Sequence, residues 1–219
     1  KADSGLHNVY STSYNRWNES ARYALFQTLY YAKSLRSAND HAIFKIGSAY
    51  EGEILEKIKK QKPLSSGLPK KGDLAVKIYY HSGGRYFRKC IKQKLSREYK
   101  EIRVKQGTEN STVCLISSSL YYWYWILRSD CYHVTKTDVS DFPVPQSVFF
   151  SPELAGIGDD LLRDLEKNAV IRTRKRKCGE IVQEVNYYVC KSKGLIDKID
   201  LKIAKHYGLT DEDVDFIIN

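Results

Sequence analysis

A block of aromatic and aliphatic residues constrains this chain more than any other feature. Every residue from Leu120 to Leu127 is apolar or aromatic, a run too apolar to lie in water and too short to span a bilayer. It predicts a helix in the core, and Ser117–Ser119 could cap it. The sequence becomes polar after Arg128 and ends at Pro143 and Pro145, since proline extends neither helices nor central strands. A buried anchor should therefore hold a polar loop in a fixed place.

The apolar pattern elsewhere predicts helices toward both ends of the chain. An amphipathic helix is expected over 20–35, and Ser48 begins a capping box with Glu51 at the start of a second helix. Further helices are expected over 152–168 and from Ser192 to Gly208, where glycine suits a left-handed C-cap.

Between these helices the period changes to that of strands. Residues 74–80 alternate with period two, HSGG at 81–84 indicates a turn, and 85–91 indicates the return strand. We therefore expect an α+β fold with a central, mainly antiparallel sheet and a buried aromatic helix, flanked by N-terminal and C-terminal helices. Its parts, which together form one compact domain, are an N-terminal helical part over 1–61, a strand-rich core over 62–146 and a helical C-terminal part over 147–219.

Positive charge is concentrated in particular regions. From Lys57 to Lys105, sixteen Lys and Arg residues stand against three acidic residues, whereas Leu195–Asn219 has six acidic residues against three lysines. Arg172–Lys177 adds five cations in six positions, which is typical of a solvated loop or of an arm that clamps phosphates. This distribution fits a surface that binds a polyanion, although a merely solubilising surface explains the composition about equally well.

The hairpin over 74–91 strengthens the binding interpretation. Its return strand would place Tyr86 and Arg88 on one face and Arg85 on the other. Aromatic and guanidinium groups alternating on a two-stranded ribbon suit a nucleic-acid groove, where Arg pairs with guanine edges or phosphates. The alternative is a surface hairpin whose arginines merely extend into solvent.

The sequence offers no catalytic or metal-binding motif. It has no G-x-S-x-G, P-loop or H-E-x-x-H pattern, and its five widely spaced cysteines form neither a zinc-binding set nor a disulfide framework. We expect no cofactor, no enzyme activity that these residues can supply, no contact with a membrane and a cytoplasmic location. The absence of methionine and the end of the chain directly after an apolar run suggest a piece of a longer protein.

Three segments carry a resemblance to a known family. They are YYHSGGRYFRKCI over 79–91, SSSLYYWYWILRSDCYHVTKTDVSDFPVP over 117–145 and SKGLIDKIDLKIAKHYGLTDEDVDFIIN over 192–219. In this order they resemble the C-terminal regions of type II and type IIG N6-adenine DNA methyltransferases and restriction–modification enzymes. The N-P-P-Y tetrapeptide and the glycine-containing cofactor motif of those enzymes are absent from this chain.

The resemblance implies a target recognition domain that selects a sequence in duplex DNA. A methyltransferase domain upstream in the same polypeptide would bind S-adenosylmethionine and methylate adenine, and the parent enzyme could include an endonuclease. Phosphates would be bound by Lys92, Lys94, Arg97, Arg172, Arg174, Lys175, Arg176 and Lys177. Base or groove contacts, all on hairpins or loops, would come from His81, Ser82, Arg85, Tyr86, Arg88, Tyr132, His133 and Lys136.

Two other functions remain open at this point. The chain could bind RNA or single-stranded nucleic acid without sequence preference, in which case affinity would fall with salt equally for all sequences. It could also be an interaction scaffold whose basic face meets an acidic protein.

Overall fold

The computed structural model describes residues 44–83, 89–129, 131–175 and 177–219. The predicted helix over 20–35 lies outside these residues. The helices are α2 (Ala49–Lys59), α3 (Glu109–Ile116), α4 (Ser119–Arg128), α5 (Lys136–Ser140), α6 (Gln146–Phe149), α7 (Pro152–Lys167), α8 (Lys193–Tyr207) and α9 (Asp211–Ile218), with short 3-10 turns at Leu64–Gly67 and Val189–Ser192. The strands are β1 (Lys62–Pro63), β2 (Ala75–His81), β3 (Cys90–Ile91), β4 (Tyr99–Lys105), β5 (Pro143–Val144), β6 (Ala169–Lys175) and β7 (Ile181–Tyr187).

The aromatic block forms helix α4 in the core, as predicted. Ser118 caps it by accepting a hydrogen bond from the Tyr121 backbone N–H at 3.0 Å. Trp125 is almost fully buried, and the Phe142 ring packs edge-on against Tyr121 at 5.1 Å between centroids. The indole Nε1–H of Trp125 donates to the carbonyl of His133 at 3.2 Å. The core helix is thus tied directly to the polar loop that follows it.

A three-stranded antiparallel sheet with the order β3-β2-β4 lies beneath the helices. On β2, Ile78 and Tyr80 are buried and Lys77 is exposed, which is the predicted alternation. The predicted return strand is described only at its end, because residues 84–88 lie outside the described parts. Two further two-stranded antiparallel pairs, β1-β5 and β6-β7, complete an α+β fold, so the predicted fold class is confirmed.

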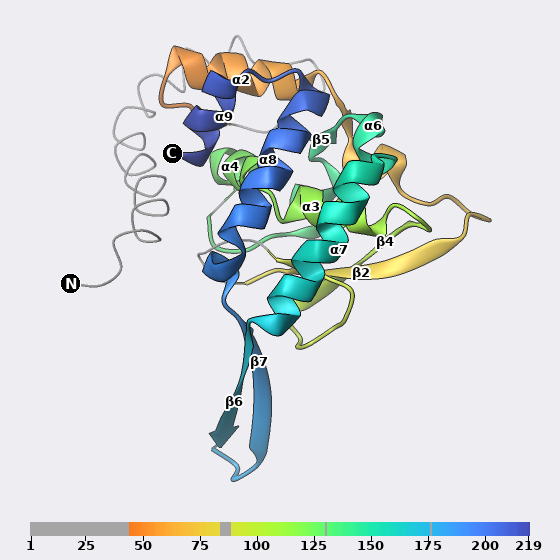
Figure 1. The fold of residues 1–219 in the computed structure, drawn as a ribbon, viewed down its shortest axis with the longest axis vertical. Coiled ribbons are helices and arrows are strands. Elements are labelled where there is room, and N and C mark those ends of the chain that lie inside the picture. The colour runs from red at the N-terminus through yellow and green to blue at the C-terminus, as the bar shows by residue number, and fades with distance from the viewer. Residues whose placement is uncertain (1–43, 84–88, 130, 176) are drawn as a thin grey trace.

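Helices α7 and α8 lie side by side over α3, and α2 and α9 close one end of the body (Figure 1). The Ser48 cap is confirmed, although the Glu51 carboxylate accepts from the N–H of Gly47 and not from Ser48 itself. Ser192 stands at the start of α8 as predicted, but its hydroxyl donates to Asp164 of α7 at 2.6 Å instead of capping the helix. Gly208 ends α8 with φ +67°, the left-handed C-cap predicted from the sequence.

The packing of α7 on α3 requires a glycine. A Cβ atom at Gly158 would lie 2.5 Å from the backbone oxygen of Asn110, whereas a Cβ at Gly156 would meet nothing within 4 Å. We expect Gly158→Ala to lower the free energy of unfolding by about 1–3 kcal/mol through overpacking, and Gly156→Ala to raise it by about 0.5–1 kcal/mol through helix propensity. Urea denaturation of the two variants measures both effects, and equal stabilities would contradict this close helix contact.

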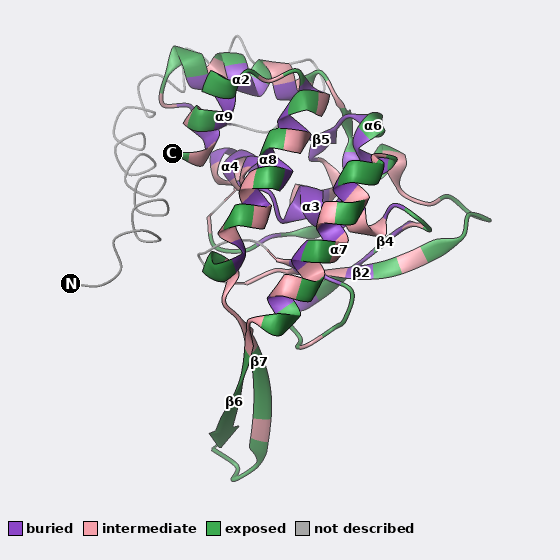
Figure 2. Ribbon diagram, viewed as in Figure 1, coloured by how far each residue is buried: buried purple, intermediate pink, exposed green. Residues whose placement is uncertain are grey.

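Strands β6 and β7 form a ribbon that projects from the body at the end opposite α2 and α9 (Figure 1). We call residues 169–187 the arm. Most of its described residues are exposed, whereas the inner faces of the helices are buried (Figure 2). The basic run at Arg172–Lys177 therefore begins in a strand and continues into the turn at the end of the arm. In the described parts of the chain, no helix is long and apolar enough to cross a membrane.

Candidate nucleic-acid interface

The arm has two chemically different faces, because residues paired across an antiparallel ribbon lie on the same side. Its even-numbered face carries Arg172 opposite Glu184 and Arg174 opposite Val182. Its odd-numbered face carries Ala169 opposite Tyr187 at the root and, beyond it, three paired rows: Ile171 with Val185, Thr173 with Gln183, and Lys175 with Ile181. The even-numbered face thus mixes arginines with Val170 and Val182, whereas the odd-numbered face combines aliphatic side chains with a Thr–Gln pair and Lys175.

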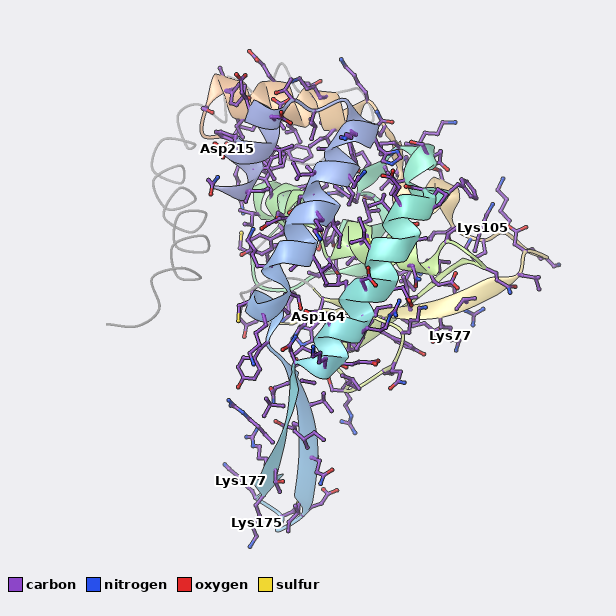
Figure 3. All side chains as sticks on the ribbon, viewed as in Figure 1. Lys77, Lys105, Asp164, Lys175, Lys177 and Asp215 are labelled. Carbon is purple, nitrogen blue, oxygen red and sulfur yellow. The ribbon has the colours of Figure 1, made fainter. Side chains whose placement is uncertain are left out.

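The cations of the arm differ in how strongly other residues hold them. Arg172 donates to the hydroxyl of Tyr188 at 2.5 Å and lies 6.0 Å from that ring's centroid. Arg174 is 3.9 Å from Glu184, and both side chains are largely exposed, so the pair contributes little to stability. Lys175 and Lys177 lie at the free end of the arm (Figure 3), and within the described ranges no carboxylate pairs with either. The end of the arm therefore has an excess of positive charge, even with Glu180 just before β7.

A polar cleft of about 660 Å³ separates the arm from the body. The arm contributes Arg174 and part of β7, and the body contributes the end of β2 and the segment between β3 and β4. The cleft thereby brings together three of the predicted DNA-binding residues, His81, Arg97 and Arg174. Arg97 is exposed, and its guanidinium has no ion pair within the described parts of the chain. The cleft also contains the carboxylates of Glu98 and Glu184, so its lining is of mixed charge, with three cations against two carboxylates.

His81 lies at the inner wall of this cleft. Its Nε2 is 3.0 Å from the Glu98 carboxylate, and its ring packs edge-on against Tyr99. Burial and the neighbouring Lys89 lower the pKa of His81, whereas Glu98 acts in the opposite direction. Burial also lowers the pKa of Lys89, which lines the same cleft. The lowered pKa favours the neutral imidazole of His81, which can supply hydrogen bonds in this cleft.

Ser82 has a structural role at the same place. Both its backbone N–H and its hydroxyl donate to the carbonyl of Glu98, at 2.8 and 2.7 Å, and its own carbonyl accepts from the N–H of Val134 at 2.9 Å. This bond joins the turn after β2 to the loop that follows the aromatic helix. The sequence predicts that both segments belong to one DNA-binding surface. In the structure the two segments are in contact.

All three contact residues predicted after α4 are exposed, and two of them lie in a loop as expected. Tyr132 and His133 are exposed, with their rings edge to face at 4.4 Å. Lys136 is also exposed, but it is the first residue of helix α5 and not part of a loop, because Thr135 and Asp138 form a capping box. The T-x-x-D pattern from Thr135 to Asp138 is the sequence signal for the start of this helix.

The remaining predicted residues divide into three groups. Lys94 is exposed on the segment between β3 and β4. Lys92 is exposed too, but it lines a second, smaller cleft together with Asp159 and Glu166 of α7, whose carboxylates make that position less suited to phosphate. Four residues lie outside the described parts of the chain: Arg85, Tyr86, Arg88 and Arg176.

Neither cofactor nor metal chemistry is supported by the described residues. No group of three or more His, Cys, Asp or Glu residues within them could hold a metal ion. Burial raises the pKa of Cys114 to about 12, so this thiol is no nucleophile.

The comparisons with known proteins do not identify the chain. No family model, no curated protein and no solved structure matches it. The candidate interface therefore consists of the arm, the cleft and the loop after α4.

Proposed function

We propose that this chain recognises a specific sequence in duplex DNA, as the target recognition domain of an N6-adenine DNA methyltransferase or restriction–modification enzyme. S-adenosylmethionine binding and methyl transfer would belong to a domain upstream in the same polypeptide. An endonuclease, where the parent enzyme has one, would also lie outside this chain. The proposed compartment is the cytoplasm, which fits five cysteines that form no disulfide.

The observation that carries this proposal is the projecting basic arm. Each of its strands has seven residues, which gives a ribbon roughly 20 Å long at about 3.4 Å per residue. The major groove of B-DNA is about 12 Å wide and admits a two-stranded ribbon. An arm of this length can therefore follow the groove over several base pairs, with Lys175 and Lys177 placed to reach phosphates.

The root of the arm supports the same function. Arg97 and Arg174 line the cleft between arm and body, where a phosphate backbone that leaves the groove would meet cations on both sides. The loop carrying Tyr132 and His133 is joined to this region through Ser82 and Val134. We assign arm, cleft and loop to one DNA-binding surface, in which phosphate contacts would set the position and side chains on the arm and loop would read bases.

Selection from a library of random duplexes tests the proposal and separates it from the alternatives. The expected result is enrichment of a defined sequence, with affinity that falls as salt rises. Uniform salt-dependent binding to duplexes, single strands and RNA would instead indicate a nonspecific nucleic-acid binder. The absence of duplex binding at low salt, in a chain whose folding is verified by circular dichroism, would favour a protein-interaction scaffold.

A further inference from the structure

We infer that the odd-numbered face of the arm is a base-reading surface and that it reads A·T base pairs in the major groove. This inference rests on the proposed binding of duplex DNA and adds to it the residues and the class of base pair. The reading residues are Ile171, Thr173, Ile181, Gln183 and Val185.

Beyond the root of the arm, the side chains of the odd-numbered face are exposed to solvent. On the even-numbered face, Arg172 is held by Tyr188 and Arg174 faces the cleft beside Glu184. From β6 only Arg174 lines the cleft, whereas Gln183 and Val185 of the odd-numbered face line it from β7. Ile171, Thr173 and Ile181 are not among the residues that line it. Ile171 and Ile181 are 63% and 69% exposed, which is unusual for large aliphatic side chains lying on one face of one ribbon. A face of this kind is expected to contact a partner.

The second step is the chemistry of the three rows. Aliphatic side chains contact the C5 methyl group of thymine, and Gln can bind the N6 and N7 atoms of adenine with two hydrogen bonds. The polar pair of Thr173 and Gln183 lies between two rows that contain aliphatic residues. In the described parts of the chain, neither polar side chain makes a hydrogen bond. Successive rows are about 7 Å apart, which is roughly two base-pair steps.

The third step distinguishes DNA from other anionic partners. The lysines at the end of the arm would also attract an anionic membrane, and the isoleucines would favour insertion into it. Insertion, however, would bury the Thr173 and Gln183 side chains in hydrocarbon without hydrogen-bond partners, which is costly. In a major groove the same two side chains meet donors and acceptors at base edges. The combination of charge, aliphatic rows and a central polar row therefore favours duplex DNA.

Modified bases test the inference on the duplex obtained by selection. Replacing thymine by uracil removes only the methyl group, and replacing adenine by 7-deazaadenine removes only the N7 acceptor. Fluorescence anisotropy should show each replacement in the arm's binding site weakening binding on the order of tenfold. The double variant Ile171→Ala/Ile181→Ala should lose most of the sensitivity to uracil, and Gln183→Ala most of the sensitivity to 7-deazaadenine.

Val170→Ala is the matched control, because Val170 is the neighbour of Ile171 on the opposite face and is itself 41% exposed. It should keep both sensitivities. If the selected sequence is still preferred but neither replacement affects binding, the inference is wrong and the proposed function stands. If no sequence is preferred, both are wrong. Tighter binding to phosphatidylserine vesicles than to any duplex would also overturn both.

Discussion

Replacing Arg174, Lys175 and Lys177 together by alanine is expected to reduce the salt dependence of duplex binding strongly while leaving the fold intact. If each cation neutralises one phosphate, the slope of log affinity against log salt should become less steep by roughly 0.9 per contact, or about 2.7 for the three. The side chains lie on the arm, outside the core, so the melting temperature should hardly change. Titrations at several salt concentrations measure the slope.

The matched control removes the same charge elsewhere. Lys77 and Lys105 lie on β2 and β4, away from the arm (Figure 3), and Arg103 is also on β4. Lys77 and Arg103 pair with Glu101, and Lys105 pairs with Asp73. The triple alanine variant of these residues changes the net charge equally but should change the slope much less. Equal effects of the two triple variants would mean that binding follows total charge and that the arm has no special role.

The second large effect concerns a buried carboxyl group in the core. Asp200 of α8 is buried, and its Oδ1 accepts a hydrogen bond from the backbone N–H of Ser119, at the start of the aromatic helix, at 2.8 Å. Its Oδ2 makes no hydrogen bond within the described parts of the chain. Burial raises the pKa of Asp200 to about 7, against the opposing effect of Ser119. The folded chain therefore holds this proton to a higher pH than the unfolded chain.

Stability should consequently fall as the pH rises. A carboxyl group whose folded pKa lies above its unfolded value favours folding at low pH, and the advantage is lost as the pH rises through the folded pKa. With an unfolded value of 3.8, Asp200 should lower the free energy of unfolding by roughly 2–3 kcal/mol from about pH 5 to about pH 8.

Asp200→Asn should abolish this fall, because the amide oxygen can still accept from Ser119 and the side chain cannot ionise. Urea denaturation at the two pH values measures the difference. Asp160→Asn, an exposed residue of α7, is the control and should keep the wild-type fall. An Asp200→Asn profile that parallels the wild type would show that Asp200 stays ionised, or stays protonated, throughout this pH range.

The elements with a clear buried side were predictable from the sequence. Helix α4 follows from an unbroken aromatic run and a serine cap, and β2 follows from its alternation, because in each case burial imposes a period on the residues. Gly208 marks the end of α8, because the left-handed conformation there favours glycine.

The arm and the cleft were much harder to predict. Strand β6 has hardly any buried side, so Arg172–Lys177 resembles a loop, and only the β-branched residues of Ile181–Tyr187 hint at its partner strand. The cleft joins the end of β2, the segment before β4 and strand β7, which are far apart in the chain. No local pattern encodes such a meeting, because it depends on how α7 and α8 hold the root of the arm.

Crosslinking from the end of the arm tests directly whether the arm binds duplex DNA. Cys178 lies in the turn of the arm and Cys190 near its root, and both are exposed. Single-cysteine variants carrying a photo-crosslinker at one position or the other are mixed with the selected duplex. If the arm lies in the groove, we expect efficient crosslinks to duplex bases from Cys178 and few from Cys190. Crosslinks from Cys190 alone, or none to duplex from either position, would contradict the binding of DNA by the arm.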